Sequence, residues 1–204
     1  MDPHRIMLWG MSFGATVSAC AAAVDRRVAA VLMVCPIFSF IRPDKRAKVF
    51  AQLMRDRESQ LRGNEPFVLQ PFNSKGENPA GFAGSGGPGG KEAYLLMMAA
   101  AERGHPNFRD RIALQSYHKM ALFRPKEVIE QMLEGIPTMM MIPELDEISP
   151  PAEQKEVFEN LKTPKKLHWA EGKGHLSILS GEGSYKFLEA EIEFFEIALK
   201  GEIK

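Results

Sequence analysis

The chain has 204 residues, 45% of them hydrophobic and 25% charged, which is typical of a globular protein with enough chain for a substantial core. Lysine plus arginine and aspartate plus glutamate balance at 26 each, so no overall charge favours nucleic acid or an acidic membrane surface. No apolar run is long enough to span a membrane and no basic-then-apolar leader opens the chain, which predicts a cytoplasmic protein.

The first predicted element leads into a nucleophile elbow. Residues 6–9 are an apolar run, and Gly10-Met11-Ser12-Phe13-Gly14 follows before a helical stretch of small residues. This is a G-x-S-x-G motif between a strand and a helix, the context in which the motif marks an exposed nucleophile. The serine of such a turn is strained and needs neighbours without a Cβ atom, which Gly10 and Gly14 provide. We predict Ser12 as a nucleophile, with a plain strand–helix turn as the alternative.

A buried β-α-β unit surrounds the elbow. Residues 14–24 predict a helix with small side chains, and residues 28–35 predict a strand buried on both faces, which Pro36 ends. The short crossover between them implies parallel strands. Cys20 and Cys35 lie in these apolar stretches without metal-ligand spacing, so we expect buried free thiols in a reducing compartment.

Residues 37–125 differ in character and form an insertion. Asp44 is placed to cap a helix that runs to about residue 60 and carries apolar residues on one face. Residues 91–103 predict a second helix, closed by Gly104, and residues 108–124 a short third one. The residues expected on the apolar faces of the first two helices are Ala47, Phe50, Ala51 and Met54, and then Leu95, Met98 and Ala99.

Residues 79–90 contain six glycines and predict a loop. The alternative is a phosphate cradle, but no apolar strand leads into this stretch and no Lys-Ser/Thr pair follows it. An excursion of this length between two strands is typical of a lid over a pocket, and its Met, Phe and Leu content suits a pliable apolar cavity. The other interpretation is that these residues pack the small core of the insertion itself.

The α/β pattern resumes after the insertion. Residues 125–133 predict a helix, 138–142 a third strand, 151–161 a helix, 166–169 a fourth strand and 184–199 an amphipathic terminal helix that covers the sheet. The apolar residues at helical spacing in the last helix are Leu188, Ile192, Phe195 and Leu199. The fold class is therefore α/β, with about four mostly parallel strands flanked by helices.

The loops after the third and fourth strands are where a site is expected, because ligands of parallel sheets bind at the carboxyl ends of strands. A serine nucleophile needs a base, and the base needs a carboxylate to orient it. His175, beside Gly174 in the last of these loops, is the predicted base. Asp146 in the earlier loop is the predicted acid, with Glu144 as its substitute. The order Ser, Asp, His is that of α/β-hydrolases.

The remaining histidines have weaker claims. His4 precedes the first strand, His105 sits in a turn and His168 lies inside a strand. His118 belongs to the insertion, where it is a candidate pocket-lining group or a structural hydrogen-bonding residue.

Three stretches of the sequence resemble a known protein family. Residues 5–14, 144–150 and 172–182 resemble the α/β-hydrolase superfamily, and more closely the fungal polyketide transferase and thiohydrolase group of secondary metabolism; residues 111–119 are similar to that group's insertion. The resemblance implies hydrolase core segments at 1–36 and 126–204 around a lid or cap at 37–125. It also implies an acyl-enzyme at Ser12, formed from an ester or carrier-bound thioester and discharged to water or an alcohol, with the Phe13 backbone N–H as one oxyanion donor.

The partners that this resemblance implies are a small-molecule ester or acyl thioester and an acyl carrier domain of a polyketide synthase. A homodimer is a separate expectation. Neither nucleic acid nor a membrane span is expected. The expectation is also for no metal and no organic cofactor.

The chain departs from the superfamily pattern at its start. A hydrolase of this fold has about four strands before its elbow strand, whereas this chain starts just ahead of that strand. A second oxyanion donor would then be missing, which would lower kcat by a factor of about 10²–10³. The elbow strand would lie at an open, apolar edge of the sheet. We expect a truncated, weakly active hydrolase. The alternatives are a non-catalytic hydrolase-like protein that binds a partner and, within the enzymes, a peptidase.

Overall fold

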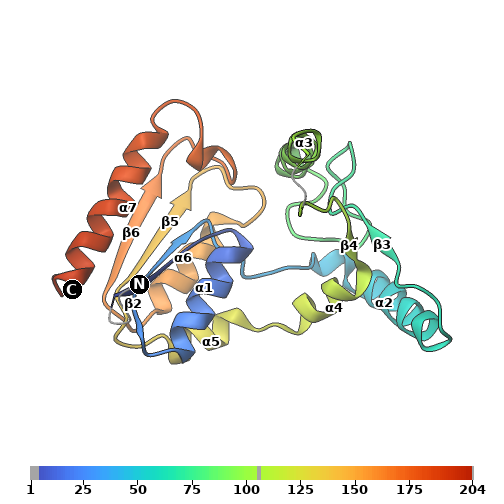
Figure 1. Cartoon of the computed structure of the whole chain (residues 1–204), viewed down its shortest axis with the longest axis horizontal. Coiled ribbons are helices and arrows are strands. Elements are labelled where there is room, and N and C mark those ends of the chain that lie inside the picture. Colours follow the sequence, from blue (N-terminus) through green and yellow to red (C-terminus); the bar gives the residue numbers. More distant parts are fainter. Residues whose placement is uncertain (1–4, 105–106, 204) are drawn as a thin grey trace. The chain divides into compact units, whose positions relative to one another are not determined.

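The computed structural model describes residues 5–104 and 107–203 and divides into two compact units (Figure 1). Unit 1 comprises Met1–Phe38 and Arg124–Lys204, and unit 2 comprises Ser39–Phe123. No helix among the described residues is both long and apolar enough to cross a membrane.

Unit 1 is built on a four-stranded parallel sheet in the order β1-β2-β5-β6. The strands are β1 (Ile6–Met11), β2 (Val28–Val34), β5 (Thr138–Pro143) and β6 (Lys165–Ala170). The predicted class, about four mostly parallel strands flanked by helices, is confirmed. The strands fall where the apolar runs predicted them, each within two residues at either end.

Helices cover both faces of this sheet, which explains why its central strands are continuous apolar runs. On β2, Val31 and Met33 pack with α1 (Phe13–Val24), α5 (Pro125–Met132) and α6 (Pro151–Asn160). Leu32 and Val34 point to the opposite face and pack with α7 (Ser184–Leu199) and the short η2 (Ser177–Leu179). Successive side chains of a strand alternate between its faces, so one apolar run supplies two cores.

The buried face of α7 is not the predicted one. The helix spans the predicted residues, but its buried side chains are Phe187, Glu191, Phe194 and Ala198. Leu188 is 56% exposed and Ile192 is 53% exposed. Apolar residues occupy two adjacent rows of this helix, and the sequence period alone does not say which row meets the sheet.

Unit 2 contains η1 (Pro43–Lys45), α2 (Arg46–Leu61), α3 (Pro88–Glu102) and α4 (Leu114–Leu122), with a two-stranded antiparallel sheet of β3 (Val68–Leu69) and β4 (Ile112–Ala113). Its core is aromatic in part. The Phe82 ring lies edge-on to both Phe72 and Tyr117, with 5.9 Å between centroids in each pair. The Asn78 amide donates a 2.8 Å hydrogen bond to the Tyr117 hydroxyl.

Several predictions for this unit need correction. Asp44 does not cap α2, because its carboxylate binds the Arg42 guanidinium instead and the helix begins at Arg46. The side chains that α2 buries are Val49, Leu53 and Asp56, opposite the predicted apolar face. Two-residue strands such as β3 and β4 carry no periodic signal, so their pairing was not predicted.

Helix α3 also differs from its prediction. It begins at Pro88 rather than residue 91, since proline suits the first turn and Gly90 packs against the backbone of Gly76. Leu95, predicted inward, is 59% exposed. The end of the helix is as predicted, with Gly104 in the left-handed region at φ 66°.

Candidate active site

Ser12 lies at the sharp turn between β1 and α1. Its backbone has φ 59° and ψ −126°, a strained conformation for a residue with a side chain. The turn is held by the Ser12 N–H, which donates to the Val34 carbonyl at 2.9 Å, so the nucleophile loop is fixed to the end of the adjacent strand. A Cβ atom at Gly10 would lie 2.6 Å from the Ala15 nitrogen, so only glycine fits there.

The predicted steric requirement for a residue without a Cβ atom does not hold at Gly14. A Cβ atom at this position would have no atom of the described structure within 4 Å. The glycine that the elbow geometry requires is therefore Gly10.

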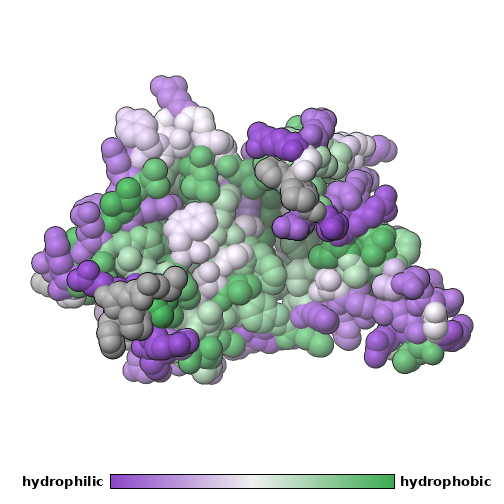
Figure 2. Space-filling model, viewed as in Figure 1, coloured by the Kyte–Doolittle hydropathy of each residue, from purple (hydrophilic) through white to green (hydrophobic). Residues whose placement is uncertain are grey.

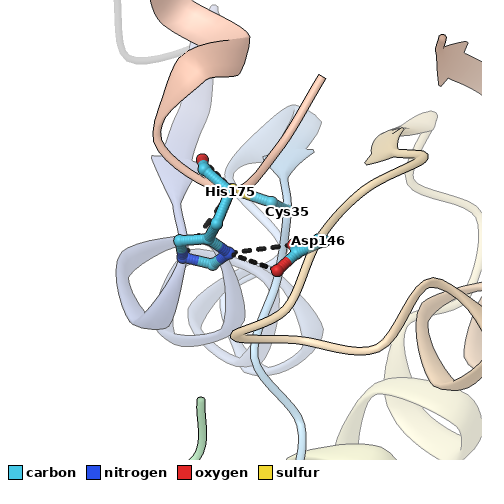
Figure 3. Close-up of side chains that lie close together, drawn as sticks. All are labelled: Cys35, Asp146 and His175. Carbon is cyan, nitrogen blue, oxygen red and sulfur yellow. Dashed lines mark hydrogen bonds and ion pairs between the residues drawn. The ribbon is translucent and has the colours of Figure 1, made fainter. Parts of the chain in front are cut away.

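The loops after β5 and β6 bring an acid and a base to Ser12. The His175 Nε2 atom lies 2.7 Å from Ser12 Oγ, and His175 Nδ1 lies 2.9 Å and 3.0 Å from the two Asp146 carboxylate oxygens. Figure 3 shows the imidazole ring with its Nδ1 side turned to the Asp146 carboxylate. His175 is 3% exposed and Asp146 is 5% exposed, so the pair is shielded from solvent, while Ser12 remains partly exposed. The structure thus brings together the three predicted residues.

Asp146 is held by donors besides His175. The backbone N–H groups of Ile148 and Ser149 donate to Oδ1 at 2.9 and 2.8 Å. The buried Gln154 side chain on α6 donates to Oδ2 at 3.1 Å and to the Ser149 carbonyl at 2.7 Å. These donors fix the orientation of the carboxylate.

Residues 35–37, which follow β2, form hydrogen bonds with the loop after β6, the loop after β5 and helix α1. The Cys35 thiol donates to the His175 carbonyl at 3.4 Å, and its Sγ lies 4.0 Å from His175 Nε2. The Ser149 hydroxyl donates to the Pro36 carbonyl at 2.6 Å. The Thr16 hydroxyl of α1 donates to the Ile37 carbonyl at 2.6 Å. The sequence predicted none of these positioning contacts, because each joins residues far apart in the chain.

Cys35, Asp146 and His175 also form a group whose ligand atoms lie within 4.8 Å of one another, which a metal ion requires. The hydrogen-bond pattern favours another use. Both His175 nitrogens face partners, on Ser12 and on Asp146, and burial followed by the nearby Asp146 charge raises the pKa of the Cys35 thiol well above its usual value. A metal would need the thiolate and a bare imidazole nitrogen.

The other candidates have the following places. Glu144 is exposed and accepts a 2.8 Å hydrogen bond from the Gly172 N–H, so it braces the two loops and is not the acid beside His175. Phe13 is the first residue of α1. His168 stands in β6 edge-on to the Phe187 ring, and burial lowers its pKa. His118 lies on α4 in unit 2, whereas His4 and His105 lie outside the described residues.

Curated fungal proteins are similar to the chain along nearly its whole length. A thiohydrolase of Eupenicillium brefeldianum is 42% identical over 97% of this chain and 62% of its own length. Polyketide transferase claH of Penicillium crustosum is 41% identical over 98% of this chain and 65% of its own length. The chain therefore spans less than two thirds of the length of these relatives. No protein-family model matches it.

Solved structures of similar proteins also match the chain along nearly its whole length. DcsB, in complex with its substrate analogue, is 60% identical with a TM-score of 0.89, over 96% of this chain and 65% of its own. The α/β hydrolase GrgF from Penicillium sp. sh18 is 34% identical with a TM-score of 0.77, over 96% of this chain and 64% of its own.

Proposed function

The chain belongs to the α/β-hydrolase superfamily, within which it resembles the fungal polyketide transferases and thiohydrolases, and on this premise we propose that it is a serine hydrolase or acyl transferase. Its substrate is an ester or a carrier-bound thioester of polyketide metabolism. The observation that carries the proposal is the 2.7 Å contact between Ser12 Oγ and His175 Nε2, with Asp146 on the other imidazole nitrogen.

The first half-reaction acylates Ser12. Asp146 accepts a hydrogen bond from Nδ1–H, which leaves the Nε2 lone pair of His175 directed at the Ser12 hydroxyl. As Oγ bonds to the acyl carbon, Nε2 takes the hydroxyl proton and Asp146 stabilises the resulting imidazolium. The C–S or C–O bond of the leaving group then breaks, and His175 passes the proton to the departing thiolate or alkoxide.

The second half-reaction releases the acyl group. Water or an alcohol gives its proton to His175 while its oxygen bonds to the acyl carbon, and the proton returns to Ser12 Oγ as the acyl–serine bond breaks. The Phe13 backbone N–H stabilises the oxyanion in both halves. Water as acceptor gives a thiohydrolase, and an alcohol gives an acyl transferase.

Unit 2 is proposed as the lid or cap that holds the acyl chain. It carries an open pocket of about 720 Å³, which lies in the size range of small-molecule sites. Apolar side chains line most of it, among them Phe67, Val68, Leu69 and Leu114.

Reaction with a fluorophosphonate, followed by intact mass, tests the proposal. The wild-type chain is expected to gain one adduct and Ser12→Ala none, because the probe needs a serine activated by its base. Ser18→Ala is the matched control, since Ser18 lies six residues further along the chain, on α1, and its hydroxyl faces the Trp9 carbonyl. An adduct that persists in Ser12→Ala, or a folded wild-type chain without any adduct, would contradict the proposal and favour a non-catalytic binding protein.

A further inference from the structure

Helix α2 exposes an apolar stripe beside its buried face. Phe50, Met54 and Leu61 are 40%, 56% and 73% exposed, and their spacing of four and seven residues places them on one face. The buried side chains Val49 and Leu53 belong to the other face. A helix that exposes apolar residues outside its own core contact has a surface suited to a partner.

Cationic side chains border the stripe on both sides. By helical spacing, Arg46 and Arg57 fall along the flank nearer the buried face, and Lys48 and Arg55 fall on the other side, beyond the exposed Glu58 that stands one turn after Met54. All four are exposed, and among the described residues none of them forms an ion pair. The α2 surface is defined here as the apolar stripe with these flanks: Arg46, Lys48, Phe50, Met54, Arg55, Arg57 and Leu61.

This cationic character is local. Residues 42–62 hold seven basic and three acidic residues, whereas the whole chain is balanced. Two of the three acids are already satisfied, because Asp44 pairs with Arg42 and buried Asp56 accepts bonds from Gln60 and Gln115. The excess positive charge is therefore presented to solvent.

A groove of about 420 Å³ between α2 and α4 continues the α2 surface. Met54 and Arg57 line it from α2, and His118 and Lys119 line it from α4. Its lining contains three basic side chains and no carboxylate. Charge complementarity thus favours a partner that presents carboxylates around an apolar centre.

We propose that the α2 surface is the docking site for the acidic face of the carrier domain that delivers the acyl thioester. The inference rests on the proposed function, in which a carrier-bound thioester acylates Ser12. A partner helix with an acidic rim and an apolar strip matches both features of the surface, since its carboxylates meet the flanking cations while its apolar residues cover Phe50 and Met54. An anionic membrane and a second copy of the chain are the competing occupants.

The test compares the same acyl group as a thioester of a carrier domain and as a thioester of a small thiol. The double variant Arg46→Glu/Lys48→Glu reverses one charge on each flank and touches neither the catalytic residues nor the lining of the groove. With an octanoyl thioester on a purified acidic acyl carrier domain, kcat/KM is expected to fall at least about tenfold, because steering is lost. With the octanoyl thioester of N-acetylcysteamine, kcat/KM is expected to stay within about twofold.

Lys186→Glu/Lys200→Glu is the matched control, since it reverses two exposed charges at α7 in unit 1. It is expected to leave both substrates unchanged. Raising the salt concentration from about 0.05 M to about 0.5 M should lower turnover of the carrier substrate by the wild-type chain far more than by the α2 variant. Equal losses for both substrates, or none for either, would overturn the docking site.

Binding measurements separate this inference from the proposed function. If the wild-type chain turns over neither substrate, the proposed function fails, and affinity of Ser12→Ala for the loaded carrier, with and without the α2 changes, still decides the docking site. Binding of the chain to phosphatidylserine vesicles but not to the carrier would overturn it in favour of a membrane. A dimer that the α2 changes dissociate, with carrier affinity unchanged, would overturn it in favour of a second copy.

Discussion

Ser12 and Cys35 are the two described residues with a side chain and a positive φ angle, and both adjoin His175. Cys35 has φ 39°. Conformations of this kind cost of order 1–3 kcal/mol each and persist only where the surroundings fix them. For Cys35 those surroundings are the N–H bond to the Met141 carbonyl at 2.9 Å and the thiol contact with the His175 carbonyl. Strain is therefore concentrated at the candidate site.

The two thiols are expected to resist alkylation in the folded chain. Burial raises the pKa of Cys20 to about 11, and burial together with the Asp146 charge raises that of Cys35. Since the thiolate is the reactive form, iodoacetamide at about pH 7.5 should leave both unmodified and any acylation activity intact. Mass spectrometry checks this, and unfolding in guanidinium chloride should make both thiols reactive. Rapid alkylation of Cys35 in the folded state, with loss of activity, would contradict the picture.

At the scale of elements, one carboxylate joins three parts of unit 2. Asp56 on α2 is 7% exposed and accepts hydrogen bonds from Gln60, from the Phe67 backbone N–H before β3, and from Gln115 on α4. Burial opposes ionisation, but these donors outweigh it and lower the pKa of Asp56. The buried carboxylate of Asp56 thus links α2, the segment before β3 and α4 through hydrogen bonds.

Asp56→Ala is expected to reduce the free energy of unfolding of unit 2 by at least about 2 kcal/mol at neutral pH, because three donors lose a charged partner. The lowered pKa means that this stabilisation is full above the unfolded value of about 4 and disappears as pH falls through the folded value. Hydrogen exchange of the α2 and α4 amides measures it, since both tryptophans, Trp9 and Trp169, belong to unit 1. Glu58→Ala on the exposed face is the control. A difference that stays constant down to about pH 3 would exclude the ionised carboxylate as its source.

At the scale of the whole molecule, β1 is an edge strand of the described sheet. Met7 is 37% exposed and Trp9 is 44% exposed along it. Beside it, Glu191 of α7 is 5% exposed and accepts a 3.1 Å bond from the Trp9 indole, and burial raises its pKa. The other Glu191 oxygen has no hydrogen-bond partner among the described residues. An apolar edge strand favours association.

The chain is therefore expected to associate as its concentration rises, and Met7→Lys should suppress this because a lysine on an edge strand opposes pairing. Light scattering over a dilution series measures the effect. Val24→Lys is the control, since it adds the same charge at the exposed end of α1. Association that is equal in both variants would place the contact elsewhere.

The sequence by itself determined the order and type of the main elements of unit 1 and the loops that carry Ser12, Asp146 and His175. The physical reason is local: apolar runs, Pro and Gly positions and the G-x-S-x-G spacing act over a few residues. The roles of those residues and the lid function of 37–125 stay predictions, which the fluorophosphonate experiment and the cavity in unit 2 address.

Only the tertiary structure decided which faces meet. Helix α7 turns Phe187 and Phe194 inward rather than Leu188 and Ile192, and α2 turns Phe50 and Met54 outward. The contacts of Gln154, Ser149 and Cys35 with the candidate site likewise became visible only in the fold. Each depends on partners distant in the chain, whose positions are set by the packing of the whole sheet and not by any local pattern.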